Sequence, residues 1–346
     1  MEPLRVMHLH FGREGGAERF FVSLARALAE RGVEQRFIIR PNRTWENDVA
    51  ALGPVIQNNF SNLIRATGYV QLRRALWTRG WPPHAYMAWM LRASKLLPVK
   101  TDAVRVTRLG VFPKNLKPFG KTDVLVGNLP GIGDRIRALG WQRRLRIITN
   151  FPRQVTPIPV SRSIHDTPDG AFLVVAGGRF VPRKGFDVAL RAIAQIDGAY
   201  LWLLGEGTEI DSLYQLAADL GIRDRVRFTG WVQEPIHALA SGDAFLMPSR
   251  HEPLGNMLLD AWTAGIPSVS TRSEGPTWFM RDGIDGYMTD IDDVDAIARA
   301  LCQLRDAPDQ GQKFAANAKA RLAEMFGKEA IVDTYIDLLS GQNGSG

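Results

Sequence analysis

Residues 244–271 read AFLMPSRHEPLGNMLLDAWTAGIPSVST, and this stretch decides the fold class. The apolar run at 244–247 predicts a buried strand, and the helix expected after it has Asn256 as its cap and ends at Gly265. The apolar run at 268–271 predicts a second strand. Strand, helix and strand at this spacing indicate two parallel strands joined by a crossover helix.

The same alternation of strands and helices continues outward along the chain. It is regular over residues 171–271 and recurs over 5–39 and 104–148, whereas residues 41–103 are interrupted by two adjacent prolines and several tryptophans. Repeated strand–helix units predict parallel sheets covered on both faces. We therefore expect an α/β protein with two doubly wound, Rossmann-like domains that face a cleft.

Length and composition agree with two globular domains. A chain of 346 residues can bury two cores, and 45% hydrophobic with 23% charged residues is a globular composition. We place the domains at residues 1–155 and 160–326, on either side of a proline-rich linker. The single cysteine, Cys302, excludes an internal disulfide and favours a reducing compartment. With no leader-like N-terminus and no apolar run of bilayer length, we expect a cytoplasmic protein.

Charge is distributed unevenly between the two halves. Residues 1–160 hold 26 Lys and Arg against 10 Asp and Glu, a net charge of +16, and the remainder carries −9. Between Asp48 and Asp102 there is no acidic residue. That segment contains Arg65, Arg73, Arg74, Arg79, Arg92, Lys95 and Lys100, interleaved with Phe60, Tyr69, Trp77, Trp81, Tyr86 and Trp89.

This basic, aromatic segment predicts peripheral binding to the anionic inner face of the cytoplasmic membrane, since each basic residue near such a surface contributes about 1 kcal/mol. The alternative is a solvated basic face above buried tryptophans. A nucleic-acid partner ranks below a membrane or a phosphorylated glycolipid, because the sequence has no zinc-finger spacing and no RNA-binding signature.

Glycine and two cations follow the strand expected at 172–175. Residues 176–185 read AGGRFVPRKG, in which Gly178 lets the backbone approach a ligand while Arg179 and Lys184 supply positive charge. Ligands bind at the carboxyl ends of strands in open α/β sheets, so a pyrophosphate is the expected guest. The spacing matches neither the Walker loop nor the dinucleotide fingerprint, which weakens ATPase and dehydrogenase interpretations. The alternative is a solvated turn.

The turn before the helix of the opening stretch adds hydrogen-bond acceptors. Leu254, Gly255 and Asn256 place free amides at the positive end of the helix, where phosphate is favoured. Glu252 and Asp260 flank them, and their carboxylates can accept hydrogen bonds from sugar hydroxyls. These groups suit a nucleotide sugar. Acidic residues near helix starts are also common for structural reasons, so the other segments must decide.

Two further turns belong to the same pattern. Gly205 and Gly207 follow the strand expected at 200–204, and Gly230 follows the one at 226–229. We expect the first turn to line the same edge as Lys184, although turns of this kind also occur without a ligand.

Taken in order, these segments resemble the retaining glycosyltransferases of family four, which have the GT-B fold. Gly15-Gly16-Ala17-Glu18 is similar to the family's N-terminal Gly-Gly-x-Glu loop, and Gly178-Arg179 through Lys184-Gly185 to its donor-phosphate segment. Glu252 through Asp260 resembles its Glu-x7-Glu motif. The resemblance covers essentially the whole chain.

The resemblance implies a role for each matched position. Arg179 and Lys184 would neutralise the diphosphate as it leaves, Glu252 would hold the transferred sugar, and Asp260 would hold the ribose. The amides of Gly15 and Gly16 would face the diphosphate across the closed cleft. It also implies a nucleotide-diphosphate sugar as donor, a hexose as the transferred group, no metal and no other cofactor.

The acceptor implied by the resemblance is a lipid-linked or lipopolysaccharide-type glycan, bound by the first domain. The donor would bind to the second domain. Residues 327–346, with a helix at about 328–339, would pack back on the first domain, as in similar proteins.

Two positions depart from the family pattern. Asp260 is one methylene shorter than the usual glutamate, and the histidine usually found after the strand at 104–107 is missing, because the chain continues Arg108-Leu109-Gly110. His84 and His251 are candidates to replace it. Asp290-Ile291-Asp292 imitates a metal motif of another glycosyltransferase architecture, but it precedes a helical run and we interpret it as helix capping.

Two rival functions remain open. A catalytically silent relative that binds a nucleotide sugar or glycolipid as an assembly partner would explain the two departures. A nicotinamide-dependent oxidoreductase would share only the strand–helix architecture and lacks the expected glycine fingerprint.

Overall fold

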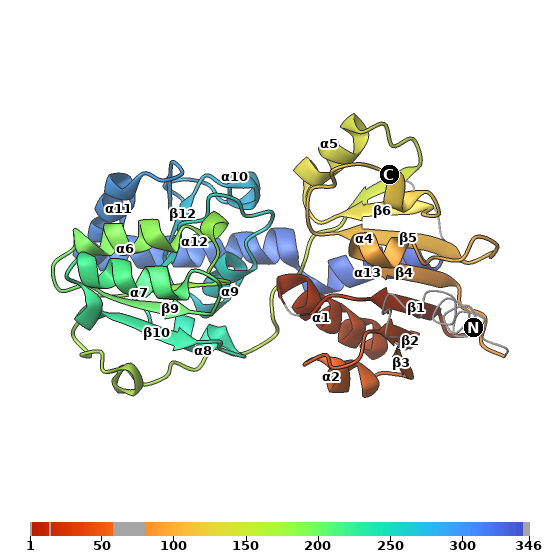
Figure 1. Ribbon diagram of the computed structural model, residues 1–346, viewed down its shortest axis with the longest axis horizontal. Coiled ribbons are helices and arrows are strands. Elements are labelled where there is room, and N and C mark those ends of the chain that lie inside the picture. The colour runs from red at the N-terminus through yellow and green to blue at the C-terminus, as the bar shows by residue number, and fades with distance from the viewer. Residues whose placement is uncertain (1, 14, 58–79, 342–346) are drawn as a thin grey trace. The chain divides into compact units, whose positions relative to one another are not determined.

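The computed structural model describes residues 2–13, 15–57 and 80–341 (Figure 1). The chain divides into two compact units, Met1–Phe151 with Lys328–Gly346, and Pro152–Gly327. The predicted membrane-binding residues Phe60, Arg65, Tyr69, Arg73, Arg74, Trp77 and Arg79 lie outside the described residues.

The described part of the first unit contains a parallel sheet of seven strands in the order β3-β2-β1-β4-β5-β6-β7 (Figure 1). The strands are β1 (Arg5–His10), β2 (Glu34–Ile39), β3 (Val55–Gln57), β4 (Ala85–Trp89), β5 (Val104–Leu109), β6 (Val124–Gly127) and β7 (Arg144–Ile147). The helices are α1 (Gly16–Glu30), α2 (Glu46–Ala50), α4 (Met90–Ser94), α5 (Pro130–Ala138) and α13 (Lys328–Leu339).

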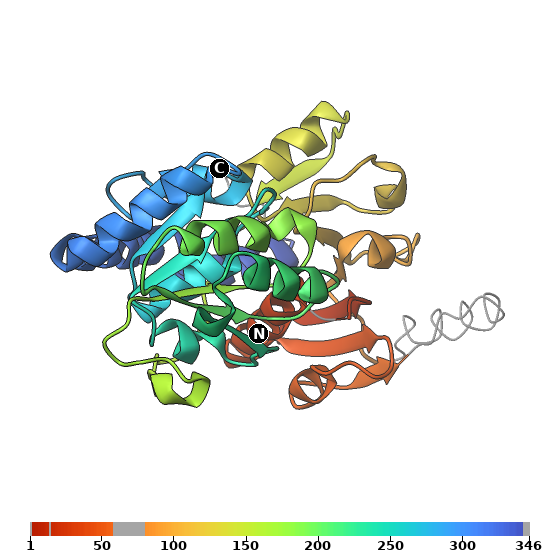
Figure 2. The ribbon, with the colours of Figure 1, turned by 60° about the vertical axis from the view of Figure 1, so that its left-hand side comes forward.

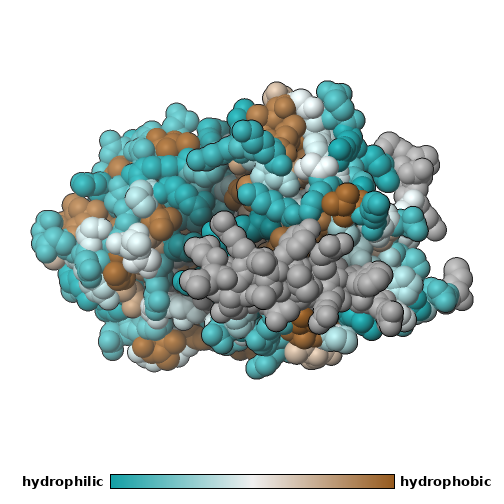
Figure 3. All heavy atoms as spheres, turned by 45° about the vertical axis from the view of Figure 1, so that its right-hand side comes forward, coloured by the Kyte–Doolittle hydropathy of each residue, from teal (hydrophilic) through white to brown (hydrophobic). Residues whose placement is uncertain are grey.

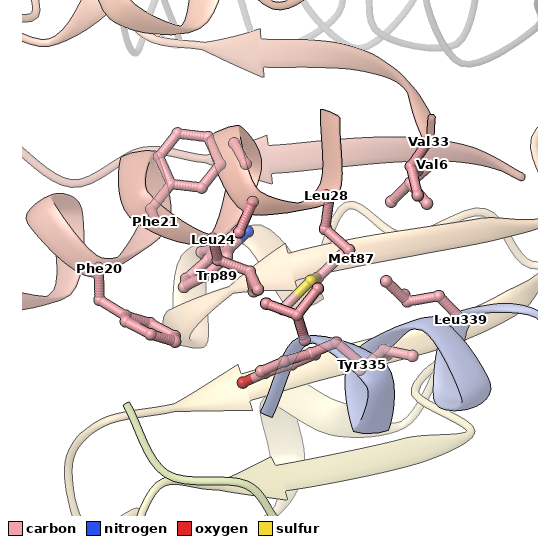
Figure 4. Packing of buried hydrophobic residues seen from close by; sticks show 14 of the residues in the cluster. Val6, Phe20, Phe21, Leu24, Leu28, Val33, Met87, Trp89, Tyr335 and Leu339 are labelled. Atoms are coloured by element: carbon pink, nitrogen blue, oxygen red, sulfur yellow. The ribbon is translucent and has the colours of Figure 1, made fainter. Parts of the chain in front are cut away.

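One face of this sheet is covered by helices from opposite ends of the sequence. The apolar stripe of α1, which includes Phe21, Leu24 and Leu28, is buried together with Tyr335 and Leu339 of α13 (Figure 4). The opposite face packs against α4, because alternate residues of the strands point the other way. The last helix is therefore part of the first unit's core.

The second unit contains a parallel sheet of six strands in the order β10-β9-β8-β11-β12-β13. The strands are β8 (Leu173–Gly177), β9 (Tyr200–Leu204), β10 (Val226–Gly230), β11 (Ala244–Met247), β12 (Ser268–Thr271) and β13 (Tyr287–Thr289). The helices are α6 (Phe186–Ala194), α7 (Ile210–Asp219), α8 (Pro235–Leu239), α9 (Asn256–Ala264), α10 (Glu274–Phe279), α11 (Val294–Asp306) and α12 (Pro308–Phe326).

Helices cover both faces of the second sheet (Figures 1 and 2). Val174 and Ala176 of β8 belong to the core that contains α6, α7 and α11, whereas Leu173 and Val175 belong to the core that contains α8, α9 and α12. This alternation explains why the strands read as nearly continuous apolar runs. The prediction of two doubly wound, parallel α/β domains is confirmed.

Local details correct two predictions about helix starts. Gly255, with a φ of +94°, occupies the cap position of α9, so Asn256 is the first helical residue rather than the cap. Asp293 caps α11 by accepting a hydrogen bond from the Ala296 amide at 2.8 Å. Asp290 and Asp292 instead pair with arginines, so helix capping does not explain that motif.

The described basic segment supports the alternative of buried tryptophans more than exposed aromatic anchors. Trp81, Tyr86 and Trp89 are all buried in the first unit. Hydrophobic residues form small separate patches on the face drawn in Figure 3. Among the described residues, no helix has both the length and the apolar character needed to cross a membrane.

Candidate functional site

The strand order of the second sheet creates a point where the chain reverses direction. From β8 the chain moves outward to β9 and β10, and then returns to β11 on the other side of β8. Loops after β8 and β11 therefore leave the same edge toward opposite faces, and open α/β sheets bind ligands at the carboxyl ends of strands at such a point. Lys184 lies in the first of these loops and Glu252 in the second.

Lys184 and Glu252 are in direct contact. The Lys184 Nζ donates a hydrogen bond to the Glu252 Oε2, and the two side chains are 15% and 13% exposed. Had they lain on opposite sides of the unit, no single ligand could have touched both. Their contact makes a shared ligand geometrically feasible.

The loop after β8 is fixed against the end of β11. Pro182–Lys184 form one turn of 3₁₀ helix, and Gly185 follows with a φ of +67°. A Cβ at Gly185 would lie 2.1 Å from the Pro248 carbonyl oxygen, so only glycine allows this approach. The Arg183 carbonyl accepts hydrogen bonds from the amides of Arg250 and His251, at 2.9 and 3.1 Å. These contacts hold Lys184 beside Glu252.

The predicted glycine turn after β9 lies against the loop after β8. The Gly178 amide donates to the Leu204 carbonyl at 2.9 Å, and the Phe180 amide to the Glu206 carbonyl at 2.7 Å. Side chains at Gly205 or Gly207 would collide with the backbone of Gly178 or Phe180. The prediction that this turn lines the same edge as Lys184 is confirmed. Arg179 is exposed at the rim of this pair of loops.

The start of α9 carries the amides expected to favour phosphate. Leu254 is buried, Gly255 turns the chain, and Asn256 opens the helix. Gly255 also leaves room for the Met247 side chain, because a Cβ at this position would lie 3.2 Å from the Met247 methyl group.

A second carboxylate beside Glu252 was missed in the sequence. Glu274, the first residue of α10, accepts a hydrogen bond from the Glu252 amide at 3.0 Å and also contacts the His251 ring. The next residue, Gly275, donates its amide to the Glu252 carbonyl at 2.9 Å. The parallel order of β11 and β12 was the available signal, because it places the loop after 268–271 next to Glu252.

The sequence analysis also missed an arginine network that holds the loop containing Glu252. Arg250 makes two hydrogen bonds to Asp187, at 2.9 and 2.7 Å, and one to Asp292, at 2.7 Å. Burial raises the pKa of Asp187, but the hydrogen bonds from Arg250 outweigh it and the net pKa is lowered. The ion pair is therefore maintained at neutral pH.

Asp260 lies in the second turn of α9 and is engaged within the protein. Its carboxylate is 3.3 Å from the Nε of Arg153, and Arg153 also pairs with Glu234 at 3.0 Å. Asp260 is 4% exposed. Arg153 was not predicted, because it lies in the linker far from Asp260 in sequence. Any ribose contact at this position has to involve the arginine as well as the carboxylate.

In the first unit the Gly-Gly-x-Glu segment forms the start of α1. Gly15 precedes the helix with a φ of +154°, and Gly16 is its first residue. The Glu18 carboxylate lies 3.8 Å from the Nε2 of His10 at the end of β1. A Cβ at Gly12 would lie 1.8 Å from the Glu18 Oε1, so this glycine makes room for the acid.

Both histidines of β1 are buried among aromatic rings, including Phe21 and Trp89. Burial lowers the pKa of His8 to about 3, against a smaller opposite effect of its hydrogen bond with Gln35. Burial, with the nearby charges of Arg108, His8 and Arg43, lowers the pKa of His10 to about 3. Both rings are therefore neutral at neutral pH.

The structure separates the two candidates for the missing histidine. His84 precedes β4 and accepts a hydrogen bond from the Arg5 amide at 3.0 Å, so it lies at the wrong edge of the sheet and that prediction is wrong. His251 lies beside Glu252 and remains a candidate. Within residues 2–13, 15–57 and 80–341, no group of three or more His, Cys, Asp or Glu side chains is arranged to hold a metal.

Comparison with known proteins agrees with this arrangement. Residues 171–306 match the family described as Glycosyl transferases group 1. The chain is 46% identical to the lipopolysaccharide core biosynthesis glycosyltransferase LpsE of Rhizobium meliloti, over 98% of this chain and all of the relative. It is 43% identical to LpsD of the same species, over 97% and 98% of the two chains.

A solved structure shows the same fold. The complex of Anabaena HepE with UDP-glucose superposes with a TM-score of 0.82 at 18% identity, covering 98% of this chain and all of the other. The GT-B prediction is confirmed, and the oxidoreductase interpretation is wrong. The chain belongs to the glycosyltransferase family that includes LpsE and LpsD.

Proposed function

We propose that this glycosyltransferase transfers a hexose, with retention of configuration and without a metal, from a nucleotide-diphosphate sugar to a lipopolysaccharide-core or other lipid-linked glycan. The observation that carries the donor assignment is the contact of Lys184 with Glu252 where β8 and β11 diverge. The likeness to LpsE and LpsD along nearly the whole chain supports the acceptor class.

The proposed step needs charge stabilisation at one oxygen. The bond from the sugar C1 to the phosphate oxygen breaks, and a bond from C1 to the acceptor oxygen forms on the same face. The acceptor proton passes to the leaving phosphate. Lys184 and Arg179 stabilise the charge that develops on the diphosphate, and Glu252 accepts hydrogen bonds from the sugar hydroxyls.

The amides at the start of α9 supply the remaining phosphate contacts in this proposal. Leu254, Gly255 and Asn256 face the ligand with the positive end of the helix, while Gly205 and Gly207 allow their turn to pack against the loop that carries Gly178. In the first unit, Gly15 and Gly16 contribute amides at the start of α1. The acceptor binds to the first unit, and the protein associates peripherally with an anionic membrane.

A panel of UDP, GDP and ADP and their sugars, read by thermal melting, tests the donor assignment. The correct ligand at 100 times its Kd stabilises the fold by about 2.7 kcal/mol. Transfer to lipopolysaccharide from a source strain deleted for this gene, with EDTA present, then tests the reaction. NMR of the product gives the anomeric configuration. Absence of any nucleotide-dependent stabilisation would refute the donor site.

A catalytically silent assembly partner is the second candidate. The burial of Asp260 against Arg153 favours it, because the carboxylate expected to hold ribose is already paired. Binding of the nucleotide sugar without transfer or hydrolysis of a labelled donor would select this candidate.

A further inference from the structure

The first two residues of α10 hold the main chain of Glu252. The Glu252 amide donates a hydrogen bond to the Oε2 of Glu274 at 3.0 Å, and the Glu252 carbonyl accepts one from the Gly275 amide at 2.9 Å. A residue whose amide and carbonyl are both bonded to the same partner segment has little freedom to change its φ and ψ angles. The direction in which the Glu252 side chain leaves the loop is therefore set by α10.

Close packing at Gly275 brings α10 this near to the loop. A Cβ at Gly275 would lie 2.3 Å from the carbonyl oxygen of Leu254, so only a residue without a side chain fits there. The start of α10 therefore contacts the loop at two places, Glu252 and Leu254, which lie two residues apart in the chain.

The same Glu274 carboxylate also holds the residue before Glu252. Its Oε1 is hydrogen-bonded to the Nδ1 of the His251 ring. Burial raises the pKa of Glu274, but hydrogen bonds from its own amide, the Glu252 amide and the His251 ring outweigh burial, and the net pKa is lowered. An ionised carboxylate can only accept hydrogen bonds, so the proton in the bond to His251 belongs to Nδ1. Glu274 thus fixes the tautomer of His251 as well as the main chain of Glu252.

The carboxylate of Glu252 can still meet a ligand. Within the described residues, the structure records one hydrogen bond to this carboxylate, from Lys184 to its Oε2. Lys184 orients the side chain of Glu252, and Glu274 fixes the main chain that carries it. Groups that hold a reacting ligand have to stay within about 0.5 Å of the productive geometry, which requires supporting residues of this kind.

A carboxylate in the first turn of a helix also has a structural explanation. Glu274 lies at the positive end of α10, where a negative charge is favoured. That explanation predicts a loss of helix stability when Glu274 is replaced, but no selective effect on a ligand. It does not require the carboxylate to bond two consecutive residues of another loop, His251 and Glu252.

We infer that Glu274 is a positioning residue, which holds the Glu252 main chain and the His251 ring so that the Glu252 carboxylate meets the hydroxyls of the donor sugar. This inference rests on the proposed function, which assigns the donor sugar to Glu252. Glu274 acts through Glu252 rather than on the diphosphate, which is assigned to Lys184, Arg179 and the start of α9. Its replacement should therefore weaken binding of the sugar part of the donor and not binding of the nucleotide.

Calorimetry separates the two parts of the donor, with whichever of UDP, GDP and ADP stabilises the protein and with the sugar derivative of that nucleotide. Glu274→Ala should raise the Kd of the nucleotide sugar about tenfold, the loss of one hydrogen bond to a charged group, and leave the Kd of the nucleotide unchanged. Glu274→Gln keeps an oxygen that can accept the Glu252 amide, so it should lose less. Asp309→Asn replaces an exposed acid in the first turn of α12 in the same unit, and as the matched control it should change neither Kd.

A double variant shows whether Glu274 acts through Glu252. If it does, Glu252→Gln combined with Glu274→Ala should lose little more affinity for the nucleotide sugar than Glu252→Gln alone. Additive losses would mean that Glu274 acts elsewhere, and they would overturn the inference.

Nitrogen NMR of the neutral His251 ring gives a readout that needs no ligand. In the unsubstituted protein the proton should lie on Nδ1, as the hydrogen bond to Glu274 requires. Glu274→Ala removes the acceptor that holds the proton there, so the share of rings with the proton on Nε2 should rise. A role limited to helix stability would not move this proton, and an unchanged tautomer in Glu274→Ala would overturn the inference.

Equal weakening of nucleotide and nucleotide sugar, or no effect on either, would also overturn the inference, because both results leave Glu274 without a role specific to the sugar. Failure of the proposed function would look different. Selective loss of sugar binding in Glu274→Ala, with no transfer by the unsubstituted protein, would refute the proposed reaction and keep this inference. Absence of nucleotide binding by the unsubstituted protein would refute both.

Discussion

The ion pair of Lys184 with Glu252 allows turnover and stability to be tested separately. Lys184→Ala removes the cation proposed to face the leaving diphosphate, and Glu252→Gln removes the negative charge while keeping the shape. Loss of a group that stabilises transition-state charge costs about 2.7–4 kcal/mol, or about 10²–10³ in turnover. Each substitution should therefore reduce turnover by orders of magnitude.

The effect on folding should be much smaller. Both side chains retain some contact with solvent, 15% for Lys184 and 13% for Glu252, so a partner left alone can still be hydrated. We expect a loss of about 1 kcal/mol in the free energy of unfolding for either variant. In a unit of this size that lowers the melting temperature by about 2–4 °C.

The assay measures initial rates with donor and acceptor varied independently, beside melting temperature. Because the two groups are proposed to hold one ligand, the double variant should lose little more turnover than the worse single variant. Lys319→Ala, at an exposed position on α12 of the same unit, is the control and should behave as the unsubstituted protein. Near-normal turnover of both single variants would refute the site, and a large loss of stability would make their rate losses structural.

Three other perturbations test the surroundings of the site. Gly275→Ala would place a Cβ 2.3 Å from the Leu254 carbonyl oxygen. We therefore expect this variant to lose about 1–3 kcal/mol in the free energy of unfolding and to bind the nucleotide more weakly. Gly170→Ala, whose Cβ would have no atom within 4 Å, should have neither effect. Arg153→Met removes the arginine that pairs with the buried Asp260 carboxylate and should lower the free energy of unfolding by about 3 kcal/mol. Adding Asp260→Asn should recover most of this loss. Equal melting temperatures of the single and double variants would contradict this expectation. In the folded protein, His8 and His10 each have a pKa of about 3, whereas a histidine in the unfolded chain has a pKa of about 6.5. Between these pH values the unfolded chain binds more protons than the folded protein. The free energy of unfolding therefore falls as the pH drops from about 6.5 towards 3. Relative to pH 8, each histidine should remove about 2 kcal/mol at pH 5, seen in urea midpoints, and His10→Asn should flatten about half of that slope.

The sequence was sufficient for contacts that follow from parallel strands. Lys184, Glu252 and the Gly205 turn all lie just after strands whose carboxyl ends share one edge, so their proximity follows once the strands are recognised. Glu274 follows a strand of the same sheet and was available by the same reasoning. The predicted end of α9 at Gly265 is also confirmed, because its φ of +77° requires a residue that tolerates the left-handed region.

Contacts that depend on side-chain reach were not predictable in this way. Arg153 meets Asp260 from the linker, and no periodicity in the sequence connects a linker residue with a particular helical turn. The prediction that His84 could replace the missing histidine was wrong because His84 precedes its strand, whereas a ligand-binding residue of this fold usually follows one. The segment that contains Trp81 and Trp89 was predicted to bind a membrane because of the basic residues around them, but both tryptophans are buried.

Arg108 occupies the position of the missing histidine, and its positive charge does not by itself indicate a sugar-binding site. Arg108 lies near the end of β5 and is 1% exposed. Its Nε donates to the Tyr335 hydroxyl at 3.1 Å, its other end bonds Asn150, and its guanidinium carbon lies 4.5 Å from the centre of the Phe20 ring.

A guanidinium that is 1% exposed and contacts Tyr335, Asn150 and Phe20 is part of the first unit's core, so we do not expect Arg108 to replace a sugar-binding histidine. It joins β5 to α13, at the far end of the sequence, and so ties the last helix into the first unit. If a side chain near Glu252 compensates for the missing histidine, His251 is in place to do so, because it neighbours Glu252 in the chain and contacts Glu274.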